Sequence, residues 1–224
     1  MKKIILPFLI LTSLIQFSCV TSWQPLVTYN TAIADNRLTG TWNSEGQDYI
    51  VEKVFDSPAY KKQKNEPISP LIKKGTKDSI LYSKSYIIRY TKDKIEYHFF
   101  CSMIKINSQV FMNITVADIT SINNGPDIDE LNLSQNWLDR LHTYTIAHVQ
   151  FSNTNTIKLN FIDGSFIYDQ IKKGRMKLKH ESDDLYDTFL ITASPAEMQQ
   201  FIQKYGNDDR FFNKENSVTL IRKS

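Results

Sequence analysis

Cysteine and glycine are scarce in this chain of 224 residues, which contains two cysteines and seven glycines. The two cysteines, Cys19 and Cys101, cannot form the several disulfides that stabilise a small disulfide-rich domain. Seven glycines leave little material for a glycine-rich phosphate-binding loop, and the Gly-x-Ser-x-Gly turn of α/β-hydrolases is absent. Cys101 lies in the apolar stretch 99–104, so we expect its thiol to be buried and unreactive.

Metal-binding and catalytic patterns are also missing. No two of the four histidines have the spacing of a zinc-binding helix, and no histidine belongs to a Cys/His cluster. The acidic groups at 127–130 and 183–184 lie in expected turns and lack the spacing of a calcium loop. We therefore expect no metal ion, no cofactor and no enzymatic activity.

An excess of charge of one sign is missing as well. The chain has 27 basic and 24 acidic residues, and Lys2 and Lys3 precede an apolar N-terminal run that we expect to be removed. The remaining chain then has 25 basic residues against 24 acidic ones. This near balance gives no reason to expect nucleic acid as a partner, and no pattern indicates a particular protein partner.

The N-terminal segment has the organisation of a secretory signal. Two lysines are followed by an almost wholly apolar run over residues 4–17, which ends just before Ser18 and Cys19. The run is too short for a comfortable membrane span, which needs about 20 apolar residues. The sequence therefore predicts a signal peptide over residues 1–18 and no later transmembrane segment.

The cysteine at the end of this run resembles the lipidated cysteine of bacterial lipoproteins. The usual pattern has Leu three residues before the cysteine, whereas this chain has Gln16, and looser signals of this kind are similar to those of Bacteroidetes-type bacteria. The resemblance implies that Cys19 carries acyl chains, such as palmitate, that anchor the protein in a membrane of the cell envelope. Residues 19–36 would then be a tether and residues 37–224 a single domain; the alternative is an ordinary cleaved signal with a coincidental cysteine.

The mature part of the chain alternates as β-strands do. Apolar side chains recur at every second position over 110–116 and again over 157–161. Asn107 and Ser108 separate the first of these runs from the run 95–106, which is typical of a tight hairpin. Similar short apolar runs occur at 49–55, 86–90, 145–151, 188–192 and 218–221. We expect a mainly β fold in which about 8–10 antiparallel strands close into a barrel, because closure removes exposed strand edges.

One helix is clearly predicted near the C-terminus. Ser194 and Glu197 form a capping box around Pro195, and Gly206 stands where the helix would end. The apolar side chains between them share one face, which we expect to pack on the barrel before the last strand. Two shorter helices are expected at residues 134–141 and 164–173.

Gly40 and Trp42, at the start of the first expected barrel strand, resemble the Gly-x-Trp signature of lipocalins. In that family the tryptophan closes one end of the barrel by packing across it. The resemblance therefore implies that Gly40 and Trp42 lie at a closed barrel end.

A broader resemblance connects the chain with a group of uncharacterised lipocalin-like bacterial lipoproteins. It is carried by residues 147–149, by residues 189–198 and the helix that follows them, and by Phe211 and Phe212 before a short final strand. It covers most of residues 36–223. The resemblance implies a lipocalin-like barrel that forms a cup for a small apolar or amphipathic molecule.

The candidates for lining such a cup are aromatic side chains and one histidine: Tyr97, Phe99, Phe111 and His148. His148 has a second interpretation as a hydrogen-bonded structural residue of its strand. Large aromatic side chains also fill small barrels well, and a barrel of about eight strands can be filled by its own side chains or can hold one small ligand. Two functions thus remain open: ligand binding, or a non-enzymatic interaction or scaffold role with a filled barrel.

A basic excursion over residues 56–79 interrupts the pattern of strands. It contains three prolines and six lysines: Lys61, Lys62, Lys64, Lys73, Lys74 and Lys77. One interpretation is a solvated loop. The other is contact with anionic lipid headgroups, since a lipid-anchored domain stays close to a membrane surface.

Overall fold

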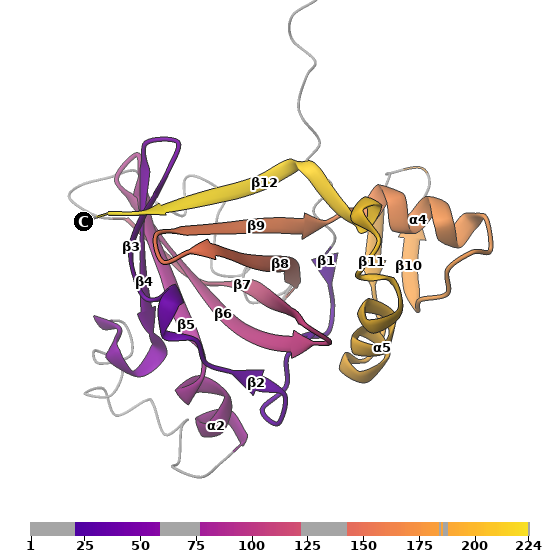
Figure 1. Ribbon diagram of the computed structural model, residues 1–224, viewed down its shortest axis with the longest axis horizontal. Helices are drawn as coiled ribbons and strands as arrows, with labels where there is room; N and C mark the ends of the chain where they lie inside the picture. Colours follow the sequence, from indigo (N-terminus) through magenta and orange to yellow (C-terminus); the bar gives the residue numbers. More distant parts are fainter. Residues whose placement is uncertain (1–20, 59–76, 122–142, 184, 186–187, 224) are drawn as a thin grey trace, which may run out of the picture.

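Eight antiparallel strands form a closed barrel in the computed structural model of this chain, which describes residues 21–58, 77–121, 143–183, 185 and 188–223 (Figure 1). The barrel strands are β3 (Gly40–Ser44), β4 (Gln47–Lys53), β5 (Tyr86–Lys92), β6 (Ile95–Ile106), β7 (Gln109–Ser121), β8 (Tyr144–Asn153), β9 (Thr156–Ile162) and β12 (Phe212–Arg222). Each of the strands β3 to β9 pairs with the next in sequence, and β12 closes the barrel by pairing with both β3 and β9. The expected mainly β, lipocalin-like barrel is confirmed.

The alternation of side chains sorts residues to the two faces of the barrel wall. On β7, Met112 and Ile114 pair with the inward residues Met103 and Cys101 of β6. Phe111, which precedes Met112, points outward. The predicted hairpin turn falls at Asn107 and Ser108, where Asn107 has a φ of 55°, a conformation that asparagine tolerates better than most residues.

One half of the barrel interior is filled by its own side chains. Trp42, Tyr86, Met103, Met112 and Ile157 are completely buried there and pack together. Cys101 is also completely buried in this group, and burial raises the pKa of its thiol. This filled half forms a solid base beneath the rest of the barrel.

A second core lies outside the barrel wall. Helix α5 (Pro195–Tyr205) places Met198, Phe201 and Ile202 against outward-facing residues of β6–β9, among them Phe111 and Ile146. The predicted capping box is present, since the Ser194 hydroxyl accepts from the Glu197 N–H and the Glu197 carboxylate accepts from the Ser194 N–H. The helix before the last strand is therefore confirmed.

Two further helices are described, and they only partly match the expectation. Helix α4 (Gly164–Lys172) corresponds to the predicted helix at 164–173 and begins at the Asp163 cap. Helix α2 (Lys77–Ser83) was not predicted. The other predicted helix, at 134–141, lies outside the described residues. Short 3-10 turns occur at η1 (Asn36–Leu38), η2 (Val54–Asp56) and η3 (Asp209–Phe211).

Four short strands extend the sheet beyond the barrel. Strand β1 (Thr21–Ser22) pairs with the start of β8 on one side and with β11 (Thr188–Ile191) on the other, and β11 pairs with β10 (His180–Asp183). We call these three strands, β1, β11 and β10, the sheet extension. Strand β2 (Ala32–Ile33) pairs separately with β6.

The segment that we expected to be a tether, residues 19–36, is from Thr21 onward part of the packed domain. Leu26 and Val27 are buried, the Val27 N–H donates to Asn113 Oδ1 at 2.8 Å, and the Gln199 amide donates to the Leu26 carbonyl at 2.8 Å. These hydrogen-bond partners are far away in sequence. The burial of the segment is therefore not visible as a periodic pattern of apolar residues within it. Cys19 itself lies outside the described residues.

The basic excursion is described only at its two ends, 56–58 and 77–79. Of its six lysines only Lys77 lies in the described part, where its Nζ is 5.2 Å from the centre of the Tyr29 ring. Within the described residues, no helix has the length and apolar character needed to cross a membrane.

Candidate ligand-binding site

The filled end of the barrel is closed by Trp42 and Arg222. The Trp42 indole donates to the Leu38 carbonyl at 2.8 Å, and the Arg222 guanidinium carbon lies 4.2 Å from the centre of the indole ring. Both Gly40 and Trp42 lie at this end, where the lipocalin resemblance placed them. The sequence alone did not single out Arg222, which is the last residue of β12.

Arg222 joins three segments of the closed end through backbone carbonyls. Its guanidinium donates to the carbonyls of Thr39 at 2.9 Å, Arg37 at 2.6 Å and Thr154 at 3.2 Å. Gly40 has a φ of 133°, and a Cβ at this position would lie 2.4 Å from Arg222 Nη1. The backbone conformation therefore favours glycine at position 40, and a Cβ there would also displace the Arg222 guanidinium.

The opposite half of the barrel contains a cavity of about 800 Å³. Ligand pockets for small molecules typically measure about 300–1,000 Å³, so the space is sufficient for one. The side chains of its wall are mostly apolar or aromatic: Tyr49, Ile88, Tyr90, Phe99, Ile114, Leu159, Phe161 and Val218. The barrel is thus a cup with a solid base and one open half.

Aromatic rings form a continuous part of the wall. Tyr90 stacks on Tyr97 with ring centres 4.8 Å apart and on Phe99 at 5.9 Å, and the planes differ by 9° and 4°. Tyr49 contacts Tyr90 at 5.3 Å. Burial raises the pKa values of Tyr49 and Tyr90, so both hydroxyls stay neutral at physiological pH.

Charge is confined to the rim of the cavity. The charged lining residues of the described chain are Glu45, in the β3–β4 turn, and Lys92, at the end of β5, and both are exposed. The described lining contains no histidine, cysteine or aspartate. A neutral wall below a polar rim suits a molecule with an apolar body and a polar end.

The four predicted lining residues divide between the two faces of the wall. Phe99 lines the cavity, and Tyr97 is on the same interior face, stacked on Tyr90. Phe111 and His148 face outward, where His148 lies 5.3 Å from Phe111 and 5.0 Å from Phe212 between ring centres. The placement therefore does not support a ligand-lining role for Phe111 and His148.

This correction has a simple physical origin. The period of two is present as predicted, but β7 and β8 are apolar on both faces because helix α5 covers the outer one. Alternation alone does not say which face is inside. His148 is 7% exposed in this outer core, and burial lowers its pKa, so the ring stays neutral at physiological pH.

A group of charged residues on the outer face of β4–β6 is a second place where chemistry could reside. Arg89 lies 3.4 Å from Glu52 and 2.8 Å from Glu96, and His98 lies 3.4 Å from Glu96. Arg89 is opposite His98 in the register of β5 and β6, so these are ordinary cross-strand contacts. Among the described residues no group of three or more His, Cys, Asp or Glu side chains could hold a metal ion.

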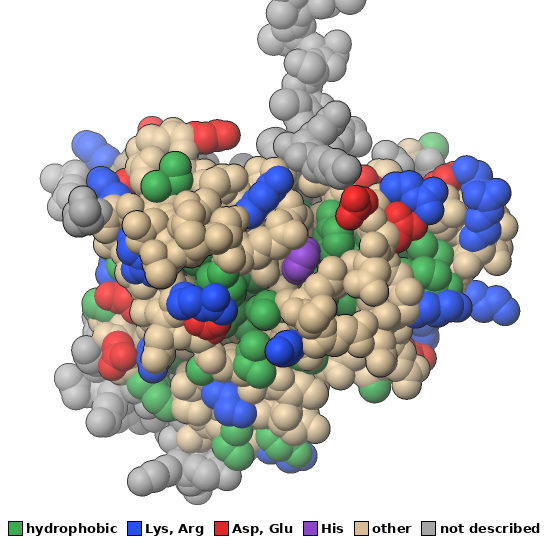
Figure 2. Space-filling model, in the orientation of Figure 1, with side chains coloured by type: hydrophobic (Ala, Val, Ile, Leu, Met, Phe, Trp, Pro, Cys, Tyr) green, Lys and Arg blue, Asp and Glu red, His purple; other side chains and the backbone are tan. Residues whose placement is uncertain are grey.

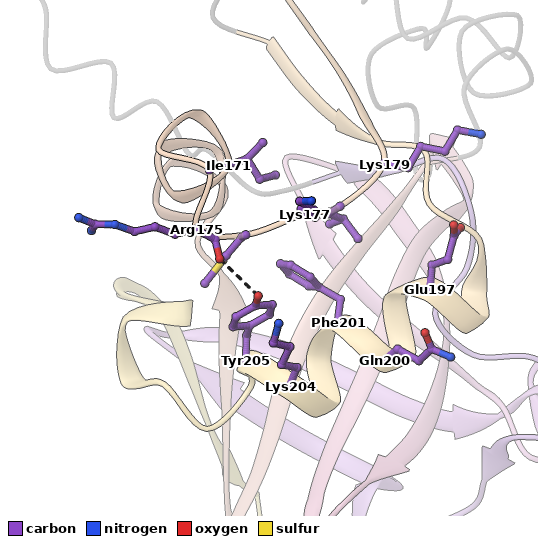
Figure 3. Close-up of a pocket in the computed structure, with 12 residues that line it drawn as sticks. Ile171, Arg175, Lys177, Lys179, Glu197, Gln200, Phe201, Lys204 and Tyr205 are labelled. Atoms are coloured by element: carbon purple, nitrogen blue, oxygen red, sulfur yellow. Dashed lines mark hydrogen bonds between the residues drawn. The ribbon is translucent and has the colours of Figure 1, made fainter.

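A surface hollow of about 760 Å³ lies between helix α5 and residues 171–179 (Figure 3). Phe201 and Tyr205 project from α5 toward this segment, and the Tyr205 hydroxyl donates to the Arg175 carbonyl at 3.4 Å. Four cationic side chains surround the hollow, Arg175, Lys177, Lys179 and Lys204, and basic side chains gather over this part of the surface in Figure 2. Arg175 points away from the hollow in Figure 3, so the cations do not converge on one point.

Comparisons of the chain with protein-family models, with curated proteins and with solved structures found no match. The candidate functional site is the barrel cavity, because of its size and its mostly apolar and aromatic wall.

Proposed function

We propose that this protein is a membrane-anchored envelope lipoprotein that binds a small apolar or amphipathic molecule in the open half of its barrel. The observation that carries the proposal is the 800 Å³ cavity, with its aromatic wall and its charges confined to the rim. The lipocalin-like barrel agrees with such a role. The lipid anchor is supported by the signal-like N-terminus and by Cys19 at its end.

The alternative is a scaffold role with a filled barrel, and only the closed half of the barrel interior is filled in this way. Trp42, Tyr86 and Met112 fill the base completely, whereas Tyr49, Tyr90 and Phe161 around the cavity remain partly exposed. Partly exposed aromatic side chains inside a barrel have lost water on one side without gaining full packing, and an apolar ligand would complete their burial. This difference between the halves favours binding.

We propose a binding role without catalysis. The described cavity lining offers hydroxyl groups but no histidine, cysteine or aspartate that could activate one of them. The two charged rim residues, Glu45 and Lys92, are exposed to water. Their place is suited to contact with the polar end of a ligand.

Native mass spectrometry of the full chain, expressed in a bacterial host and purified in mild detergent, tests the binding role. We expect an additional mass that is lost on denaturation and that organic extraction identifies as an amphipathic small molecule. In the variant Phe161→Arg the long charged side chain would occupy the cavity with its head at the rim, so the additional mass should disappear. The control Ile221→Arg changes a side chain that is 58% exposed on β12, and it should retain the mass.

The two variants must show the same near-ultraviolet circular dichroism as the unchanged protein, so that a loss of ligand is not a loss of fold. If the additional mass persists in Phe161→Arg, the ligand is bound elsewhere and the cavity assignment is wrong. If no ligand mass is found, the same protein is titrated with a fluorescent fatty acid analogue. Failure to bind this probe would overturn the binding role.

A further inference from the structure

Strand β10 is a free edge of the sheet. The sheet extension leaves the barrel at β8, continues through β1 and β11, and ends at β10, which among the described strands pairs with β11 alone. In Figure 1 strand β10 lies beyond β11, on the side away from the barrel strands. The backbone groups on the outer side of such a strand can pair with a strand of another chain.

The hydrogen bonds to β11 show which backbone groups of β10 face outward. The Thr192 N–H donates to the Lys179 carbonyl at 3.0 Å, so the backbone groups of Lys179, and by alternation those of Glu181, point toward β11. The N–H and C=O groups of His180 and Ser182 therefore point away from β11. Within the described residues these groups have no hydrogen-bond partner, so they are available to a further strand.

The side chains along this edge carry charges of both signs in a simple order. Four exposed charged residues stand at every second position: Lys177, Lys179, Glu181 and Asp183. Strand alternation places the last three on one face of the edge. The sign changes in the middle of the row, so its first half is cationic and its second half is anionic.

Charges on an edge strand usually discourage pairing with other chains. A row of one sign would repel a second copy in every register, but the mixed row of β10 does not. In an antiparallel pair with His180 opposite the second copy's His180, Lys179 of each copy meets Glu181 of the other, and opposite charges in such positions attract. Moving the centre by one residue would instead place Lys179 opposite Lys179, or Glu181 opposite Glu181. One register is therefore favoured by charge.

We propose that two copies of this chain associate through their β10 edges as an antiparallel pair with a twofold axis at His180. The outward backbone groups of His180 and Ser182 then lie in the hydrogen-bonding positions of the new ladder. Lys179 and Glu181 lie in the alternate positions, where the side chains of two strands approach most closely. The contact is isologous and closed, so it produces a dimer and not a fibre. This surface is separate from the cavity, and the proposal does not depend on the proposed function.

The dimer is expected to be weak. Pairing of one short edge buries less than the area of about 1,200 Å² that is typical of stable interfaces, so we expect a dissociation constant of about 10–100 µM. The Asp183 carboxylate also accepts from the Leu185 N–H at 2.8 Å within its own chain. The experiment therefore uses the central pair, Lys179 and Glu181.

Sedimentation velocity of the full chain tests the pairing. The protein is expressed in a bacterial host, purified in mild detergent, and measured over a range of concentrations around the expected dissociation constant, with micelles in excess of the chain. Lys179→Glu and Glu181→Lys should each weaken the dimer about 30-fold, because attractive contacts on both sides of the axis become repulsive. The double variant Lys179→Glu, Glu181→Lys exchanges the two charges and should restore the dimer. An equimolar mixture of the two single variants should also form it.

Lys105→Glu is the matched control for the change of charge. Lys105 is exposed and lies on β6, opposite Val110 of β7 in the barrel wall, so this variant should dimerise as the unchanged protein does. Hydrogen exchange of the unchanged protein locates the interface independently. The amides of His180 and Ser182 should exchange more slowly above the dissociation constant than below it.

Each variant must keep the near-ultraviolet circular dichroism of the unchanged protein. Weakening by both single variants, restoration by the double variant and slower exchange in β10 together support the proposal. A chain that stays monomeric at the highest concentration overturns it. A dimer that both single variants leave unchanged places the contact elsewhere and also overturns it. A dimer that the single variants weaken and the double variant does not restore overturns the proposed register.

Discussion

Replacing Trp42 by alanine is the most direct test of the closed barrel end. The Trp42 side chain is completely buried, packs in the base of the barrel and donates a hydrogen bond to the Leu38 carbonyl at 2.8 Å. Truncation of a buried tryptophan to alanine costs about 3–5 kcal/mol, the sum of lost apolar burial and an unfilled cavity. We expect Trp42→Ala to lower the free energy of unfolding by about 4 kcal/mol, the middle of that range.

The Arg222 guanidinium stacks on the same indole ring at 4.2 Å. A variant at this position separates the free energy of the cation–ring contact from that of burying Trp42. Arg222→Met removes the cation and its three hydrogen bonds to carbonyls but keeps an apolar chain of similar length. The double variant, compared with both single variants, isolates the coupling between the two side chains. We expect a coupling free energy of about 0.5–2 kcal/mol, the range for a partly desolvated cation over an indole ring.

Urea denaturation followed by far-ultraviolet circular dichroism measures these free energies. Trp23→Ala is the matched control, because the same residue type is removed from a position where it is 45% exposed, and the loss should stay within about 0.5 kcal/mol. A loss below about 1 kcal/mol for Trp42→Ala would refute the reasoning, since no well-packed buried tryptophan is so easily removed. A coupling near zero would mean that Arg222 acts only through its carbonyl contacts.

Three further predictions concern the anchor and two titrating groups. Cys19→Ala should abolish incorporation of labelled fatty acid and release the chain from the membrane fraction; continued acylation would refute the assignment of Cys19. Burial lowers the pKa of His148 below its ordinary value of 6.5, so the unfolded chain binds more protons as the pH falls through this range. The free energy of unfolding should therefore decrease from about pH 7 to about pH 5. In urea titrations at each pH, His148→Gln should make this decrease smaller. An unchanged decrease in the variant would contradict the assignment to His148. The Arg210 guanidinium, 2.6 Å from Asp208, lowers the pKa of that carboxyl from 3.8 to about 2. The stabilising contribution of this ion pair should therefore be lost only below about pH 4. In an NMR titration, Arg210→Ala should move the titration midpoint of Asp208 back toward 3.8.

Local features of the fold could be predicted well because their causes lie within a few residues. The helix after Ser194 is determined by a capping box, a proline in the first turn and one apolar face, all within twelve residues. The hairpin at Asn107 and Ser108 follows from two alternating runs and a residue that tolerates a positive φ. Helix α2 was missed because it has only seven residues and none of them is buried, so no apolar face marks it in the sequence.

The candidate site was predictable only in part. Tyr97 and Phe99 were correctly expected on the interior face. Tyr49, Tyr90 and Phe161 were not singled out, although all three stand in runs that were predicted to be strands. Selecting them would have required knowing which face of each strand closes inward. For Phe161 on β9 the pattern is ambiguous because helix α5 packs on the outer face of β6–β9 and makes that face apolar as well.

The sequence by itself indicated the positions of most barrel strands, the mainly β class and the helix before the last strand, because hydrophobic patterning and helix capping are local properties. Only the tertiary structure decided that Leu26 and Val27 belong to the core, that Arg222 joins the closed end, and that one half of the barrel is filled while the other is open. Each of these depends on contacts between residues far apart along the chain, such as Val27 with Asn113 and Arg222 with Thr39. Such contacts form only when the barrel closes, and no short stretch of sequence encodes them alone.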